Sequence, residues 1–244
     1  MNISPNSIVG EVVKYNFKTA PVFQANNIDY CCGGNKVISA ACNEVGINTE
    51  QLIKKLEILV AQKDPDSEYV NNLGLGELCN YIVKRHHEYV RESIPVLKKN
   101  LEKICQVHGE HHPELFEIKK LFSGSAGDFI MHMQKEELML FPFIQRLESA
   151  KRQNSPLPKG PFGSVSNPIE MMMEEHQTEG ERFQEISRLS KNYQPPEDAC
   201  TTYEVTFKQL RDFENDLHRH IHLENNILFP KALVLENEYY ENIK

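Results

Sequence analysis

Apolar residues recur every three or four positions through four long stretches of the chain. In residues 78–104, Val83 is followed after a gap by Val90, Ile94, Leu97, Leu101 and Ile104, which step by threes and fours, a spacing typical of an amphipathic helix. The same periodicity predicts helices over about 114–150, 168–191 and 198–229. Residues 109–113, 151–168 and 192–196 are rich in helix breakers and separate the four stretches. With no strand pattern, the sequence predicts an all-α protein built mainly from an antiparallel four-helix bundle.

The first 63 residues have a different pattern, with short helices expected at 7–15, 19–25, 36–44 and 49–61, the last capped by Thr49. The polar segment 64–67 contains Pro65 and is expected to break the chain. We therefore expect a small helical domain over 1–63 and the bundle over 70–244.

Composition narrows the classes of function. The 244 residues include 35 acidic and 27 basic side chains, giving a net charge of −8, which argues against a nucleic-acid partner. No apolar run reaches the roughly 18–20 residues of a membrane span, and no secretory signal is visible at the start. Six Cys are too few for a disulfide framework, so we expect a reduced, cytoplasmic protein. Ten His beside many carboxylates indicate either a polar surface or a metal site, and composition does not decide between the two.

An internal repeat organises those His residues. His132 and Glu136 are followed by Phe141-Pro142, and the same H-x3-E-x4-F-P pattern returns at His220 and Glu224, 88 positions later. Upstream, His87 precedes His132 by 45 residues and His176 precedes His220 by 44. The second pair of helices therefore repeats the first, and each pair brings one His and then one His-x3-Glu.

The helical register turns these side chains inward. Residues four apart share one helix face, and His220 and Glu224 continue the apolar stripe of Leu210, Phe213 and Leu217. Buried carboxylates are costly unless they are paired or bind metal, and inward His and carboxylate clusters are how bundles build di-iron or di-manganese sites. Imidazole-rich ligation favours iron or zinc over magnesium or calcium, and six ligands exceed a tetrahedral zinc site. The expected ligands are His87, His132, Glu136, His176, His220 and Glu224.

The other His residues are weaker candidates for metal ligands. His86 could replace His87 by periodicity alone, although the repeat offset favours His87. His218 and His222 lie two residues from His220 and are expected on a helix flank.

Two adjacent cysteines, Cys31 and Cys32, lie in the turn Asp29-Tyr30-Cys31-Cys32-Gly33-Gly34. The turn precedes a predicted helix, and thiolates near a helix N-terminus have a lowered pKa and raised reactivity. A reactive or metal-handling thiol pair and two small buried residues are both open readings, and Cys42 could join the pair.

The thiol turn followed by the His and Glu repeat resembles the iron–sulfur cluster repair di-iron proteins, the RIC or ScdA/YtfE type. The likeness covers essentially the whole chain and implies a hemerythrin-like bundle. It implies two iron ions in an oxo- and carboxylate-bridged non-haem centre, held by the six ligands. It further implies repair of clusters damaged by nitric oxide or oxidative stress, through iron donation in the bacterial cytoplasm. The resemblance gives Cys31 and Cys32 a part in iron transfer and Glu175 a supporting position beside the metal.

Three functions follow as hypotheses. The leading one is an iron donor rather than an enzyme, acting on damaged or apo iron–sulfur proteins. The second is catalytic reduction of nitric oxide or another small oxidant at the same centre. The third is a carrier or sensor of nitric oxide or dioxygen. A homodimer is a possible assembly, and manganese also fits the ligands.

Overall fold

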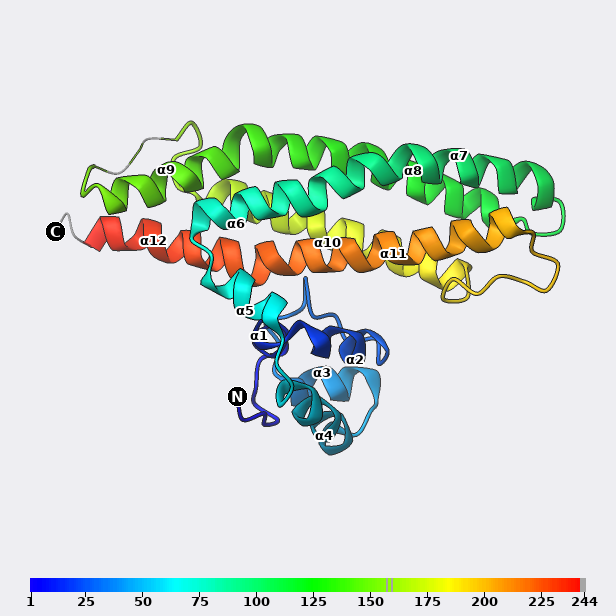
Figure 1. Cartoon of the computed structure of the whole chain (residues 1–244), viewed down its shortest axis with the longest axis horizontal. Coiled ribbons are helices and arrows are strands. Elements are labelled where there is room, and N and C mark those ends of the chain that lie inside the picture. Colours follow the sequence, from blue (N-terminus) through cyan, green and yellow to red (C-terminus); the bar gives the residue numbers. More distant parts are fainter. Residues whose placement is uncertain (157, 159, 242–244) are drawn as a thin grey trace. The chain divides into compact units, whose positions relative to one another are not determined.

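The computed structural model describes residues 1–156, 158 and 160–241. In that part of the chain every regular element is helical (Figure 1), which confirms the predicted all-α class. Among these residues no helix is both long and apolar enough to cross a bilayer.

Short helices occupy the N-terminal region. A 3-10 turn, η1 (Phe17–Thr19), separates the first two of six helices, which are α1 (Val9–Tyr15), α2 (Ala20–Gln24), α3 (Ile38–Val45), α4 (Thr49–Val60), α5 (Pro65–Asn72) and α6 (Leu75–Ile82). Two expectations for this region, the cap of the fourth helix and the break at residues 64–67, are wrong. The cap of α4 is Asn48, whose side chain accepts from the N–H of Gln51 at 2.9 Å, and Thr49 is the first helical residue. The segment expected to break the chain begins α5, because proline is well tolerated at the first helical position.

Three of the long helices contain a π-helical turn. α6 continues through η2 (Val83–His87) into α7 (Glu88–His108), and α8 (Glu114–Lys135) continues through η3 (Glu136–Leu140) into α9 (Phe141–Arg152). α10 (Ser166–Leu189) has no such turn, whereas α11 (Thr201–Leu223) continues through η4 (Glu224–Leu228) into α12 (Phe229–Glu241). The last helix therefore runs well beyond position 229, where the sequence pattern placed its end. Pro230 is the second residue of α12, and its missing N–H falls directly after η4, where the regular hydrogen-bond ladder is already interrupted.

The chain divides into two compact units, each described by itself. Unit 1 consists of Met1–Cys79, Ile144–Val165 and Arg219–Lys244, and unit 2 of Asn80–Phe143 and Ser166–His218. The expected boundary between residues 63 and 70 stays a prediction.

In unit 2, side-chain pairs join neighbouring helices. Glu102 near the end of α7 pairs with Lys119 near the start of α8 at 2.6 Å. Asp128 of α8 pairs with Arg182 of α10 at 2.9 Å, and Asn100 of α7 bonds Gln209 of α11 at 3.0 Å. The rings of Phe122, Phe183 and Phe213 meet between α8, α10 and α11, with centroids 5.4 and 5.5 Å apart around Phe213. Burial of these aromatic rings supplies much of the stabilising apolar contact.

In unit 1, two glutamates extend the internal repeat beyond the motif. Glu148 of α9 accepts from the N–H groups of Leu75 and Gly76 at the start of α6, at 2.7 and 2.9 Å. Glu236 of α12 lies 88 positions later and accepts from the Val165 N–H, just before α10, at 2.9 Å. Each carboxylate satisfies backbone donors that a helix start leaves without partners.

Candidate metal centre

Four of the six expected ligands belong to unit 2 and come from separate helical segments. His87 ends η2, His132 lies in α8, Glu136 begins η3 and His176 lies in α10. All four side chains are buried. Two of these residues lie in π-helical turns, which occur frequently at functional sites because they interrupt the regular helical ladder.

The ligating atoms of these residues converge on Glu136. His87 Nε2 lies 3.4 Å from Glu136 Oε2, and His132 Nε2 lies 3.4 Å from Glu136 Oε1. His132 and His176 face each other with their Nε2 atoms 3.1 Å apart, and His132, Glu136 and His176 offer ligand atoms within 4.8 Å of one another. Nitrogen and oxygen donors therefore meet in a buried space, with the carboxylate lying between two imidazoles.

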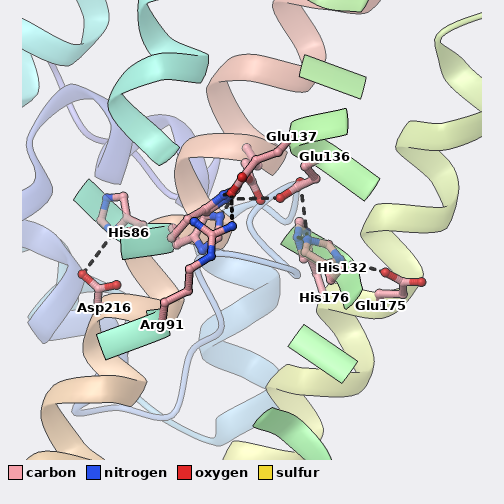
Figure 2. Close-up of polar contacts among 11 residues, drawn as sticks. His86, Arg91, His132, Glu136, Glu137, Glu175, His176 and Asp216 are labelled. Carbon is pink, nitrogen blue, oxygen red and sulfur yellow. Dashed lines mark hydrogen bonds and ion pairs between the residues drawn. The ribbon is translucent and has the colours of Figure 1, made fainter. Parts of the chain in front are cut away.

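A carboxylate holds the outer nitrogen of two of these imidazoles. Glu137 lies 2.6 Å from His87 Nδ1, and Glu175 lies 2.8 Å from His132 Nδ1 (Figure 2). The hydrogen bond from His132 and the one from Lys135 lower the pKa of Glu175 to about 2, although burial opposes this. Burial also opposes ionisation of Glu137, but hydrogen bonds from His87 and Arg91 outweigh it and lower its pKa.

These outer contacts determine what the inner nitrogens can do. An ionised carboxylate accepts a proton-bearing Nδ1, so the neutral imidazole presents a lone pair at Nε2. Metal-ligating histidines commonly have such carboxylate partners. Aromatic rings add to the orientation, since Phe141 stacks on His87 and Phe129 on His132, with ring centroids 5.8 and 5.3 Å apart.

His86 and His87, the two competing candidates, have different partners. His86 Nδ1 lies 3.0 Å from Asp216, and Figure 2 shows its ring turned toward Asp216 rather than toward Glu136. His87 contacts Glu136 directly. His86 is therefore a buried histidine with a structural partner.

The other two expected ligands, His220 and Glu224, belong to unit 1. His220 lies in the last turn of α11 and Glu224 begins η4, and both side chains are fully buried. His220 Nε2 lies 2.8 Å from Glu224 Oε1. This places an imidazole and a carboxylate on one face of the helix, as the four-residue spacing predicted.

The donor types of each unit fit iron. Unit 2 brings three imidazoles together with the Glu136 carboxylate, and unit 1 holds one imidazole beside one carboxylate. Imidazole nitrogens and carboxylate oxygens are ligands that non-haem iron accepts. A carboxylate that is ionised at full burial needs a positive partner to offset its desolvation.

The thiol turn lies in unit 1, and the surroundings of Cys31 differ from those of a thiol at a helix N-terminus. α3 begins at Ile38, six residues after Cys32, so no helix N-terminus stabilises a thiolate. Contact with the Cys32 thiol and burial raise the pKa of Cys31 well above its usual value. The carboxylate of Asp29 lies 3.3 Å from Cys31 Sγ, and Asp29, Cys31 and Cys32 form a group of possible metal ligands. Cys42 is buried in α3 and is not part of that group.

The structure shows several neighbours of the expected site that the sequence either did not identify or assigned differently. Glu137 was not identified because only the tertiary structure brings it to His87, 50 positions away. Glu175 was expected beside the metal through its neighbour His176, but it bonds His132. His222 is not on an open flank: it is buried, with its ring centroid 6.0 Å from that of Phe17 and 5.9 Å from that of Tyr30. The sequence feature that associated His222 with the site was its position two residues after the expected ligand His220.

Comparison with known proteins agrees with this site. A family model described as the hemerythrin HHE cation binding domain matches residues 80–232, and a model described as a domain of unknown function (DUF542) matches residues 5–60. An iron-sulfur cluster repair protein YtfE of Yersinia pseudotuberculosis is 34% identical over 87% of this chain and 90% of its own length. An iron-sulfur cluster repair protein ScdA of Staphylococcus haemolyticus is 31% identical over 94% of this chain and 99% of its own. The chain therefore belongs to the hemerythrin HHE cation-binding family and, over most of its length, to the family of the YtfE and ScdA proteins.

Proposed function

We propose that this protein stores two iron ions and donates iron to iron–sulfur proteins whose clusters have been damaged by nitrosative or oxidative stress. The observation that carries the proposal is the buried convergence of His87, His132 and His176 on Glu136, together with the matching His220–Glu224 pair. The relatives named as iron-sulfur cluster repair proteins support the same reading.

The proposed ligands share the work of holding iron. Four imidazoles and two carboxylates would hold the two irons, with the carboxylates supplying the negative charge that offsets the charge of the metal. The full set is His87, His132, Glu136, His176, His220 and Glu224. Because ligands must be deprotonated to bind a metal and are protonated when it leaves, a site of neutral imidazoles and two carboxylates is suited to reversible loading.

Cys31 and Cys32 are proposed to take part in transfer rather than in storage. Cys32 is partly exposed while Cys31 is buried, so Cys32 is the thiol that an acceptor protein can reach. Their group with Asp29 offers soft sulfur and hard oxygen ligands together. The cytoplasmic location is part of the proposal, since reduced cysteines and iron–sulfur acceptors occur there.

The test replaces both bridging carboxylates, using Glu136→Gln with Glu224→Gln in the full chain. Glutamine keeps the shape but cannot supply the charge, so we expect the iron content to fall from two ions per chain to none. Restoration of a nitric-oxide-damaged iron–sulfur acceptor should be lost in parallel. Iron analysis, absorption spectroscopy and acceptor activity are the measurements.

A matched control replaces two exposed glutamates of the long helices, Glu170→Gln with Glu204→Gln, and should change neither readout. Retention of two irons by the first double variant would refute the ligand assignment. Loss of iron without loss of acceptor restoration would refute iron donation. Steady catalytic consumption of nitric oxide by the iron-loaded protein, with no iron reaching the acceptor, would favour a reductase instead.

A further inference from the structure

The thiol turn of unit 1 is held together by one side chain. The carboxylate of Asp29 accepts from the backbone N–H groups of Cys31 and Cys32 at 2.9 Å each, and from that of Gly33 at 2.8 Å. Three backbone donors converging on one carboxylate make the turn a compact loop. The turn is therefore one hydrogen-bonded unit, and a contact that holds this unit sets the position of both thiols.

One set of contacts that holds this loop comes from the π-helical turn η4. The Nδ2 of Asn226 donates to the carbonyl of Cys31 at 3.0 Å, and Asn225 makes a longer contact of 3.4 Å to the same oxygen. Asn226 Nδ2 also lies 3.3 Å from Nδ1 of His222, which approaches the Tyr30 carbonyl at 3.4 Å. The amide of Asn226 is thus the shortest link between the loop and the helix.

Two glycines leave room for that amide. A Cβ at Gly10 would lie 2.4 Å from Asn226 Oδ1, and a Cβ at Gly34 would lie 2.8 Å from the same atom. The Gly10 N–H in turn donates to the Gly34 carbonyl at 2.7 Å. The backbone of the loop and the backbone of α1 therefore both pack closely against the end of the Asn226 side chain.

Asn226 also belongs to the segment that carries two proposed iron ligands. It lies two residues after Glu224 within η4, and His222 lies between His220 and Glu224. A π-helical turn has an irregular hydrogen-bond ladder and can adjust locally. A shift of Glu224 when iron binds or leaves would be passed through two backbone units to Asn226.

We propose that Asn226 is a positioning residue that couples the Cys31–Cys32 turn to the iron ligands His220 and Glu224, so that iron occupancy changes the accessibility of the Cys32 thiol. The inference rests on the proposed function, because it assumes iron at Glu224. Coupling between two sites is reciprocal in free energy, so the state of the thiol turn also changes how firmly iron is held.

The experiment measures the alkylation rate of Cys32 by iodoacetamide in the full chain, resolved from the other cysteines by peptide mass spectrometry. The iron-free protein and the protein loaded with two irons are compared. In the unmodified chain we expect loading to slow Cys32 alkylation at least about fivefold, the lower end of typical coupling. In Asn226→Ala the two rates should become equal while the iron content stays at two. Asn43→Ala, at an exposed helical position of α3, is the matched control and should keep the difference.

Three results would overturn the proposal. Equal rates in the two forms of the unmodified chain would show no coupling, and with two irons present would leave the proposed function intact. Protection that persists in Asn226→Ala would mean that iron binds Cys32 directly or acts by another route. Where Asn226→Ala fails to fold or to hold iron, Gly10→Ala decides, because its Cβ displaces the Asn226 amide while keeping every side chain of the link; unchanged protection there also refutes the coupling.

Discussion

At the scale of single residues, the outer partners of the imidazoles matter as much as the imidazoles. The spacing of His and Glu along the helices predicted that the six expected ligands face inward, and all six are buried, but it wrongly left His222 on a flank. It could not predict that Glu137 would hold His87 or that Glu175 would hold His132, because each pair is joined only by packing between helices. Periodicity gives the face of a helix, whereas the partner across the interface depends on axial register.

Glu137→Gln tests the role of the outer carboxylates. The charged acceptor at 2.6 Å from His87 Nδ1 would be replaced by a neutral amide, which weakens the lone pair offered at Nε2. We expect the affinity for iron to fall about 10- to 100-fold, the usual effect of losing such a partner. Competition with a chelator measures this affinity.

The control for that variant is Glu88→Gln, which alters an exposed carboxylate adjacent to His87 in sequence. It should leave the affinity unchanged. An unchanged affinity in Glu137→Gln would contradict the claim that this carboxylate supports the ligand.

At the scale of elements, helices were predictable and their irregularities were not. The apolar period predicted all four long helices, but η2, η3 and η4 leave no mark in that period. Each coincides with a proposed ligand, since η2 ends at His87, η3 begins at Glu136 and η4 begins at Glu224. The fourth helix was expected to end at about residue 229, but it continues through η4 and α12 to Glu241.

The connection between α10 and α11 contains Tyr193, which interacts with the buried acid Glu214 of α11. Residues Lys191, Asn192 and Tyr193 all have positive φ, at 51°, 58° and 58°, a conformation that costs energy outside glycine. Tyr193 is buried, and Arg211 lies 5.8 Å from the centre of its ring. Burial raises the pKa of Glu214, on the facing helix, from 4.5 to about 7.

Glu214 should therefore make stability depend on pH. A folded-state pKa above the unfolded value means that its contribution to stability is fully present below about pH 4.5 and is lost as the pH rises through about 7. Glu214→Gln removes this loss. Relative to the unmodified chain, the variant should gain about 1 kcal/mol in free energy of unfolding between about pH 6 and about pH 8. Denaturant titrations at both pH values measure the gain.

Glu204→Gln, an exposed position on the same helix α11, controls for the loss of one charge and should show no such gain. A constant difference between Glu214→Gln and the unmodified chain across this pH range would mean that Glu214 is ionised throughout.

At the scale of the whole molecule, the sequence repeat extends further than its ligand motif. The 88-residue offset relates His132 to His220 and Glu136 to Glu224, and it also relates Glu148 to Glu236, which satisfy backbone donors at the starts of two helices. The repeat was detectable from sequence because ligand chemistry restricts residue type. The matching glutamates were not, because many exposed Glu residues obscure them. The contact between Asn226 and the thiol turn has no sequence signal, since it joins positions 195 apart.

The most direct test of iron donation follows the iron itself. The protein is loaded with iron-57 and mixed with an iron–sulfur acceptor whose cluster has been damaged by nitric oxide, in the presence of a chelator that captures free iron. The acceptor is then separated and measured by Mössbauer spectroscopy. Iron donation predicts that iron-57 appears in the restored cluster as the protein loses its label. Restoration with unlabelled iron, or full retention of iron-57 by the protein, would contradict it.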